Sequence, residues 1–351
     1  MQERNVHLDL LRFLSIVGVI TLHCSAGLLL NNQFFLTQPW FVSLFYDSLF
    51  RWCVPTFIMI SGVLLIEKCG NAFDFKRFYT DRFLKILIPF LAWSLIYVYW
   101  KNKDNATVDY WTEIKSIATQ PIYYHLWFVY MILGIYCIMP VIAVVVKNRR
   151  SEQVIIYFLI LWFILGPTKL TIENLYGPIL RLDVEYLNGA LPYTIMGYYL
   201  NRLAISKKIF LYSVVLFLSS LSVTMFSVIH AIKTNGQINF FFLDFRAPNV
   251  VIMSATIFLI TKFICNLFNF DNFSILSQIL SFISKLSLGV YLCHVIILES
   301  LTLGYFGFKL DSYTFNAFAS VPLFTLSTLL MSLLFCLFIY KISPPLRKIL
   351  I

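Results

Sequence analysis

Charged side chains are scarce in this chain. They make up 13% of its 351 residues, whereas a typical soluble domain carries about 25%. Hydrophobic residues make up 60%, and the mean hydropathy is +0.80. One globular core cannot bury that much apolar surface, so the composition excludes an ordinary soluble enzyme and predicts a multi-pass membrane protein.

Other common features are also missing. Asp9 and Arg12 interrupt the place where a cleavable signal peptide needs an apolar core, and no small-residue cleavage site follows. The seven cysteines have no CxxC spacing, so we expect neither a disulfide nor a metal site. The sequence shows no internal repeat, and no pair of broken helices at matching positions in two halves, which counts against an inverted-repeat transporter. We therefore expect one polytopic membrane domain over residues 1–351.

The apolar runs predict an all-α bundle of about ten transmembrane helices. Stretches of about 16 to 25 residues with few charges mark the candidate spans. They are residues 9–30, 41–66, 83–100, 126–146, 153–168, 186–201, 209–231, 247–268, 286–304 and 319–340. The fifth is short, and the sixth contains Asn188, Gly189 and Pro192, so these two have the weakest signal.

The placement of charge predicts the topology. If the amino terminus is cytoplasmic and ten spans alternate, the inner segments hold 18 of the 27 basic residues but only seven of the 17 acidic ones. This excess is the positive-inside pattern, and it puts both termini in the cytoplasm. The net charge of +10 then reflects topology and contact with anionic membrane lipids rather than a nucleic-acid partner.

An arginine and a histidine share one face of the first apolar run. The step from Arg12 to His23 is eleven residues, which returns to within about 20° of its starting direction on an α-helix and rises about 16 Å. Arg12 is then near one membrane surface and His23 near the middle. An imidazole at that depth is costly, which indicates a functional group. The alternatives are a histidine bonded for packing and an arginine that reaches lipid phosphates.

Residues 67–85 form a short, strongly basic inner loop. Its basic residues are Lys68, Lys76, Arg77, Arg82 and Lys85. If the third span begins here as a helix, Arg82 and Lys85 are three residues apart and share a face. Such a pair can clamp phosphates. The alternative is an ordinary positive flank of a membrane helix.

The second apolar run contains a charge and two small residues. Arg51 lies in the outer half of the expected span and needs a partner or a water-filled cavity. Asp47, four residues earlier, is on the same helical face and is the candidate partner. Further along, Ser61 and Gly62 are small positions where helices approach closely or a ligand enters.

Two later stretches add aromatic and imidazole groups. These groups are His125, Trp127 and Tyr130 at the outer start of the fourth span, and Ser287, Tyr291, His294 and Glu299 in the ninth. Tyr291 and His294 are three residues apart and face one way. An aromatic belt at the membrane interface explains His125 and Trp127. It does not explain an imidazole and a carboxylate inside an apolar run.

Taken together, five stretches resemble the membrane-bound acyltransferase type 3 family. More narrowly, they are similar to its stand-alone bacterial members that O-acetylate surface glycans, such as the enterobacterial common antigen O-acetyltransferases. The stretches are LDLLRFLSIVGVITLH, VPTFIMISGVLL, FYTDRFLKILIPF, HLWFVYMILGIYCIMP and ISKLSLGVYLCHVII, in that order. The paired basic motif of the family falls on Arg82 and Lys85, with Lys where Arg is usual, so the planar fork that binds phosphate is lost at one position.

The resemblance implies a ten-helix enzyme of the bacterial inner membrane. Its donor would be cytoplasmic acetyl-CoA, used as a co-substrate with no permanently bound cofactor, and its acceptor a glycan reached from the outer side. Combined with the geometry above, it places the CoA phosphates near Arg12, Arg82 and Lys85, with Arg77 on the same loop. The thioester reaches His23, which either deprotonates a sugar hydroxyl or is itself transiently acetylated.

The remaining candidates fill two supporting roles in this hypothesis. Ser61, Tyr291 and His294 line the donor cleft and hydrogen-bond the thioester oxygen or the acceptor. Arg51, His125 and Trp127 shape the outer mouth, where the acceptor enters. The alternative function is a transporter or lipid-linked glycan flippase, in which the same charges line an alternating-access path. A purely structural membrane subunit does not explain so many intramembrane ionisable groups.

Overall fold

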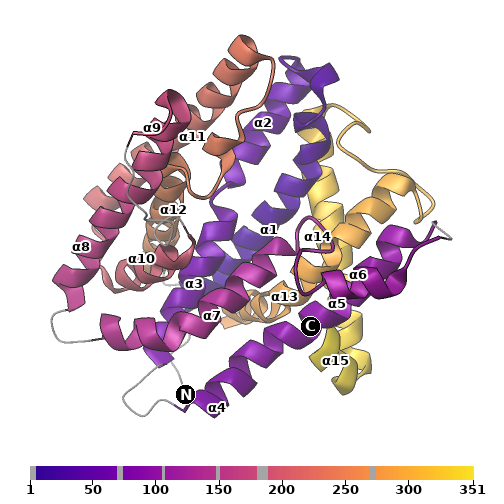
Figure 1. Cartoon of the computed structure of the whole chain (residues 1–351), viewed down its shortest axis with the longest axis horizontal. Coiled ribbons are helices and arrows are strands. Elements are labelled where there is room, and N and C mark those ends of the chain that lie inside the picture. The colour runs from indigo at the N-terminus through magenta and orange to yellow at the C-terminus, as the bar shows by residue number, and fades with distance from the viewer. Residues whose placement is uncertain (1–4, 69–73, 105–106, 148–150, 180–188, 269–273) are drawn as a thin grey trace.

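The chain forms an all-α bundle (Figure 1). A computed structural model describes residues 5–68, 74–104, 107–147, 151–179, 189–268 and 274–351, and no strand occurs in these ranges. The α-helices are α1 (Val6–Leu29), α2 (Gln38–Phe50), α3 (Cys53–Lys68), α4 (Phe75–Phe78), α5 (Leu84–Asn102), α6 (Tyr110–Ser116), α7 (Trp127–Val146), α8 (Ser151–Phe163), α9 (Lys169–Tyr176), α10 (Leu191–Arg202), α11 (Lys207–Asn235), α12 (Pro248–Leu267), α13 (Ser274–Leu303), α14 (Ala317–Ile342) and α15 (Pro344–Leu350). Short 3₁₀ or π-helical turns are η1 (Asn32–Phe34), η2 (Tyr79–Phe83), η3 (Ile164–Thr168) and η5 (Phe240–Leu243).

Nine segments within the described ranges are long and apolar enough to cross a membrane. This confirms the prediction of a polytopic all-α membrane protein. The span expected over residues 186–201 is not among these nine segments. Residues 186–188 are outside the described ranges, and most of the rest belongs to the twelve-residue helix α10. At 1.5 Å per residue α10 is about 18 Å long, whereas the hydrocarbon core is about 30 Å thick. Pro192 stands in the first turn of α10, where its missing N–H costs nothing.

Two other spans are interrupted rather than straight. The second span, expected over 41–66, consists of α2 and α3 with a break at Arg51 and Trp52. The fifth, expected over 153–168, continues to Tyr176 through the π-helical turn η3, which contains Pro167. Proline lacks the N–H that an α-helix needs there, and a π-helical turn accommodates the lost bond. Part of the expected inner loop, residues 69–73, is also outside the described ranges.

The short helix α10 packs tightly against α3, because both helices present a glycine at the crossing. A Cβ added at Gly62 would overlap the backbone of Thr194, and one added at Gly197 would overlap the backbone of Met59. Small residues let two backbones approach this closely, which is the main way that helices associate within a membrane. Gly62 therefore serves as a packing position, as its residue type suggested.

We expect Gly62→Ala to destabilise the bundle by about 1–3 kcal/mol, the usual cost of overpacking. The clash is with backbone rather than with a flexible side chain, so a rotamer change cannot relieve it. Thermal unfolding of the protein in detergent measures the effect. Gly134→Ala on α7 is the matched control, since nothing lies within 4 Å of a Cβ there. Equal stability of the two variants would contradict the close packing.

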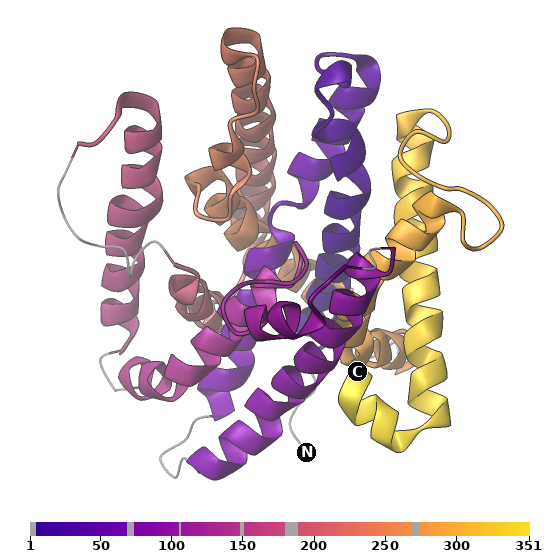
Figure 2. The same ribbon diagram turned by 45° about the vertical axis from the view of Figure 1, so that its right-hand side comes forward.

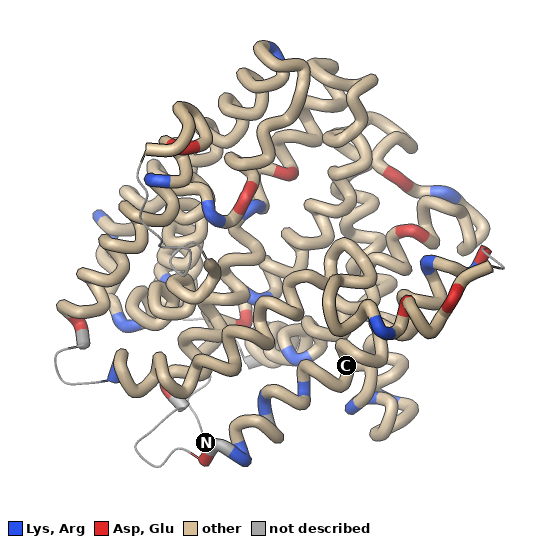
Figure 3. Tube along the Cα trace, viewed as in Figure 1, with Lys and Arg blue, Asp and Glu red and all other residues tan. Residues whose placement is uncertain are grey.

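The beginning of α1 and the carboxyl-terminal helix α15 lie at the same end of the bundle (Figure 2). Nη1 of Arg12 donates to Oγ of Ser284 at 2.6 Å, and Nε1 of Trp93 donates to the carbonyl of Leu350 at 3.0 Å. Basic residues follow α4, the start of α5 and α15 at this end (Figure 3). We call it the Arg12 end and treat its cytoplasmic orientation as a proposal from the charge pattern.

Candidate active site

Three histidines from distant parts of the chain meet inside the bundle. His23 comes from α1, His125 stands two residues before α7, and His294 comes from α13. The ring centroids of His23 and His294 are 5.3 Å apart, those of His125 and His294 5.3 Å, and those of His23 and His125 6.5 Å. The structure thus brings together three sequence candidates that had been assigned to separate roles.

His125 is held by its backbone rather than by its ring. The hydroxyl of Tyr291 donates to the carbonyl oxygen of His125, which ties the segment before α7 to α13. The ring is 1% exposed, and neither of its nitrogens has a hydrogen-bond partner of normal geometry among the described residues, although the backbone of Leu292 is near. Burial lowers the pKa of His125 well below its ordinary value, and His294 and His23 lower it further. His125 is therefore neutral at physiological pH.

His294 has a defined tautomer. Its Nδ1 is 2.6 Å from the carbonyl oxygen of Tyr291, and a carbonyl oxygen can only accept, so Nδ1 carries the proton. The lone pair of neutral His294 is then on Nε2, which is buried and has no hydrogen-bond partner among the described residues. Tyr291, expected to bond the thioester oxygen, uses its hydroxyl proton on the carbonyl of His125. Its role in this structure is to position His125.

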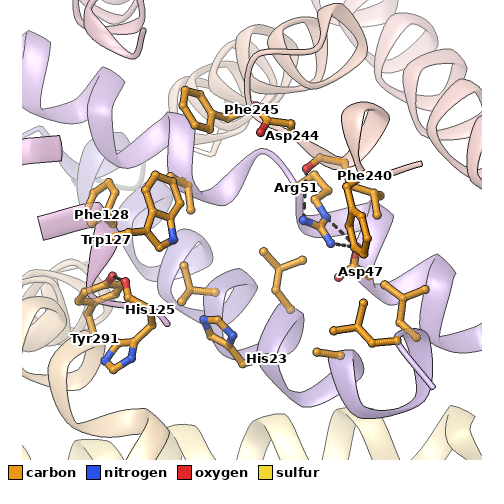
Figure 4. Close-up of a pocket in the computed structure, with 17 residues that line it drawn as sticks. His23, Asp47, Arg51, His125, Trp127, Phe128, Phe240, Asp244, Phe245 and Tyr291 are labelled. Carbon is orange, nitrogen blue, oxygen red and sulfur yellow. Dashed lines mark hydrogen bonds and ion pairs between the residues drawn. The ribbon is translucent and has the colours of Figure 1, made fainter. Parts of the chain in front are cut away.

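His23 opens onto a cavity of about 500 Å³, which we call the Arg51 cavity. Figure 4 shows Trp127, His125 and Tyr291 along one side of it and Arg51 on the other, with His23 between them. Trp127 is the first residue of α7 and stacks on Phe245 at 5.8 Å between ring centroids. The three residues predicted for the acceptor side, Arg51, His125 and Trp127, therefore line one cavity together with His23.

Arg51 and Asp47 form the predicted ion pair. Nε of Arg51 donates to Oδ1 of Asp47 at 2.6 Å, and Nη2 makes a second bond to the same oxygen. Nη1 donates to the carbonyl of Leu243 at 3.2 Å. The side chain of Asp47 is 2% exposed and that of Arg51 is 23% exposed. The aspartate is therefore buried, while the arginine keeps contact with the cavity.

This difference in exposure predicts an asymmetry between two variants. Arg51→Met leaves a buried carboxylate without its cation and should destabilise the protein by about 3 kcal/mol. Asp47→Asn leaves an arginine that faces the cavity and should cost about 1 kcal/mol, the value of one ordinary hydrogen bond. Thermal unfolding in detergent compares them. The double variant should lose less stability than the two single variants lose together. Losses that simply add would show that the pair is not coupled.

A second cavity of about 140 Å³ lies beside Arg12, and we call it the Arg12 cavity. Ser61, Tyr136 and Ser287 also line it. Phe128 and Tyr291 line both this cavity and the Arg51 cavity. The two cavities therefore adjoin at Phe128 and Tyr291. His23 and His125 line the Arg51 cavity, whereas His294, which was expected to line the donor cleft, is not among the described lining residues of either cavity.

The basic residues predicted to bind the donor are not equivalent. Arg82 is half-buried in the π-helical turn η2. Its charge acts on both Arg12 and the hydroxyl of Tyr136. Lys85 is exposed on α5 and Arg77 is exposed on α4. The π-helical turn η2 ends at Phe83, and Lys85 lies on α5. Of these three basic residues, Arg82 is the one whose charge acts on Arg12, and we call Arg12, Arg82 and Tyr136 the Arg12 cluster.

Sequence reasoning missed Tyr124 and Tyr136. The ring of Tyr124 is 5.1 Å from that of His23 between centroids, and Tyr136 lines the Arg12 cavity with Val129 and Ile132. Those three residues of α7 have the spacing of one helical face. The spacing therefore predicts which residues share a face of α7, but the sequence does not say which other helices that face meets.

One comparison with known proteins identifies the chain. No curated protein and no solved structure matches it significantly. The model of the acyltransferase domain, type 3, matches residues 5–341. That match covers nearly the whole chain, including all three histidines and both arginines of the two cavities. The protein therefore belongs to the acyltransferase 3 family and is a multi-pass membrane acyltransferase.

Proposed function

We propose that this protein moves an acetyl group from cytoplasmic acetyl-CoA to a hydroxyl of a surface glycan or of its lipid-linked precursor, in the bacterial inner membrane. The observation that carries the proposal is the position of His23. It lies beside His125 and His294, in a cavity that adjoins the arginine-lined Arg12 cavity. A general base, a cationic anchor and an open cavity are the parts that acyl transfer needs.

The cationic groups at the Arg12 end would hold the donor. The charge of Arg82 acts on Arg12, and two guanidinium groups suit the phosphates of CoA because each can make paired hydrogen bonds. Exposed Arg77 and Lys85 add positive charge at the entrance. The pantetheine arm would then pass Ser61 and Tyr291 and bring the thioester to His23.

Acyl transfer at His23 can follow either of two sequences, and in each the proton of the acceptor hydroxyl is accounted for. In direct transfer, the imidazole takes the proton of the acceptor hydroxyl while the oxygen attacks the thioester carbonyl carbon. The C–S bond then breaks, and the imidazolium returns the proton to the CoA sulfur. In the alternative sequence a ring nitrogen of His23 attacks the thioester carbonyl carbon, the C–S bond breaks, and the CoA sulfur takes the remaining ring proton. The acceptor hydroxyl then attacks the acetyl-imidazole, the N–C bond breaks, and the hydroxyl proton returns to His23. Both need the imidazole in its neutral form, and the buried, neutral His125 beside it adds no positive charge.

We expect Arg82→Ala to raise KM for acetyl-CoA by about tenfold, the loss of one charge-assisted hydrogen bond, and to lower kcat less. Lys85→Ala is the matched control, because Lys85 is exposed and outside the Arg12 cluster. Steady-state kinetics with varied acetyl-CoA measure both. If the two variants raise KM equally, the basic residues act only through the general positive charge of this surface.

The proposal is tested with purified protein in nanodiscs and acetyl-CoA labelled in its acetyl group. Binding, thioester hydrolysis and covalent label are followed together. Turnover that depends on His23 supports acyl transfer, and label bound to His23 supports the covalent sequence. Substrate movement across the membrane without consumption of acetyl-CoA would instead support the alternative transporter or flippase function, which family membership disfavours.

A further inference from the structure

A third cavity, of about 410 Å³, also reaches His23, and we call it the Glu299 cavity. It is lined from α1, from the segment before α7, from α13 and from the loop after α13. Among the lining residues that the structure describes, it shares only His23 with the Arg51 cavity. The function proposed above uses the Arg12 and Arg51 cavities and leaves this one without a role.

The helical wheel of α1 explains why His23 lies between two cavities. Val19, Ala26 and Leu30 face the Arg51 cavity, whereas Cys24 and Gly27 face the Glu299 cavity. At about 100° per residue these two sets occupy neighbouring faces of the helix. His23 is at their shared edge, so a group bound at His23 has open space on two sides.

The wall of the Glu299 cavity is acidic and rich in hydroxyl groups. Glu299 and Asp311 line it together with Tyr123, Tyr124 and Tyr313, and no Lys or Arg is among the described lining residues. Carboxylates accept hydrogen bonds from sugar hydroxyls, and tyrosine rings cover the apolar faces of sugar rings. The same wall repels a negatively charged ligand.

Glu299 is held ready to accept further bonds. Its Oε1 accepts from the hydroxyl of Tyr123 at 2.6 Å, and its Oε2 accepts from Nε1 of Trp100 at 2.6 Å. Each carboxylate oxygen has a second acceptor site. Asp311 is held in a similar way, because its Oδ1 accepts from the backbone N–H of Tyr313 at 2.8 Å and from the hydroxyl of Thr314 at 3.0 Å. Because these carboxylates are already fixed, little side-chain entropy is lost when they bind a ligand.

We propose that the Glu299 cavity is a second sugar subsite, which binds the neighbouring, non-anionic sugar of an acceptor whose reacting sugar lies at His23. The inference rests on the proposed function and adds to it the substrate class. The acceptor has at least two sugar units and extends into the Arg51 cavity and the Glu299 cavity. Its second unit bears hydroxyl groups and no carboxylate or phosphate.

The experiment uses fragments of one and two sugar units from the de-O-acetylated surface glycan of the producing cell, with acetyl-CoA as donor. In the native protein the second sugar should raise kcat/KM by about tenfold, as one charge-assisted hydrogen bond would. Glu299→Gln should remove most of that gain and leave the rate with the one-sugar fragment close to native. The glutamine amide can still accept from Trp100 and donate to Tyr123, so the wall is kept while the acid is lost.

A second acceptor tests the charge of the subsite. The two-sugar fragment, oxidised to a carboxylate on the sugar that is not acylated, should be a poor acceptor for the native protein. It should improve in the double variant Glu299→Gln, Asp311→Asn, because the repulsion is gone. Such a gain of activity cannot arise from poor folding. Asp109→Asn is the matched control: Asp109 caps α6 outside the cavity, and asparagine caps equally well.

The two failures are distinct. If acetyl transfer depends on His23 but shows no gain from the second sugar, or keeps that gain in Glu299→Gln, or if the oxidised fragment does not improve in the double variant, the second subsite is wrong and the acyltransferase function stands. If no fragment receives an acetyl group in a His23-dependent way, the proposed function fails, and the subsite with it.

Discussion

Replacement of His23 by alanine is expected to lower acetyl transfer by about 10²–10⁴-fold, the range that a positioned general base contributes. Of the described residues, His23 alone lines both the Arg51 cavity and the Glu299 cavity, so neither His125 nor His294 occupies an equivalent position. In the covalent sequence the loss is complete, because the acetyl group has no carrier. Transfer of labelled acetyl to a glycan acceptor measures the effect.

The control for His23→Ala is His230→Ala. His230 is exposed on α11 and stacks on Phe226, with ring centroids 6.0 Å apart, far along the chain from the cluster. Both variants should unfold at temperatures near that of the native protein, since neither His23 nor His230 is fully buried. Full activity in a folded His23→Ala variant would remove His23 from the chemistry and leave His125 and His294 as candidates.

The second large effect is expected at Arg12. Arg12→Ala should raise KM for acetyl-CoA by about 10- to 100-fold, because a charged hydrogen bond to phosphate is worth about 1.5–3 kcal/mol. Arg12→Lys should recover part of the loss, since lysine keeps the charge but not the paired geometry. The dependence of the rate on acetyl-CoA separates this effect from a loss of kcat.

Arg12 also has a structural bond, so a second variant is needed. Its Nη1 donates to Oγ of Ser284 and lies 3.9 Å from Oδ1 of Asp9. Ser284→Ala removes the first bond and leaves the guanidinium in place. If Ser284→Ala raises KM as much as Arg12→Ala does, Arg12 acts by packing α1 against α13 rather than by binding phosphate.

Local pattern explains the predictions that are confirmed. The i, i+4 spacing of Asp47 and Arg51 predicts their ion pair, because two residues four apart on a helix are always neighbours. Gly62 shows the close helix approach that its small size allowed for the same kind of reason, since residue size is a local property. The membrane class follows from the scarcity of charge, which needs no knowledge of the fold.

Predictions that depended on a distant partner were incomplete. Tyr291 and His294 do share a face of α13, with ring centroids 5.9 Å apart. The hydroxyl of Tyr291, however, is bonded to the carbonyl of His125, 166 residues away in the chain. The pairing of Arg82 with Lys85 stays a prediction: Arg82 lies in the π-helical turn η2 and Lys85 in the first turn of α5.

The sequence by itself determined that this is a helical membrane protein of the acyltransferase 3 family, with Arg12 and His23 in one helix and an ion pair beside the second span. These features depend on composition, on helical periodicity and on motifs, which are all properties of short segments. Tertiary structure alone decided that three histidines meet, that α10 is too short to span the membrane, and that His23 stands between the Arg51 cavity and the Glu299 cavity. The physical reason is that periodicity defines the face of each helix, whereas packing against distant helices decides what that face meets.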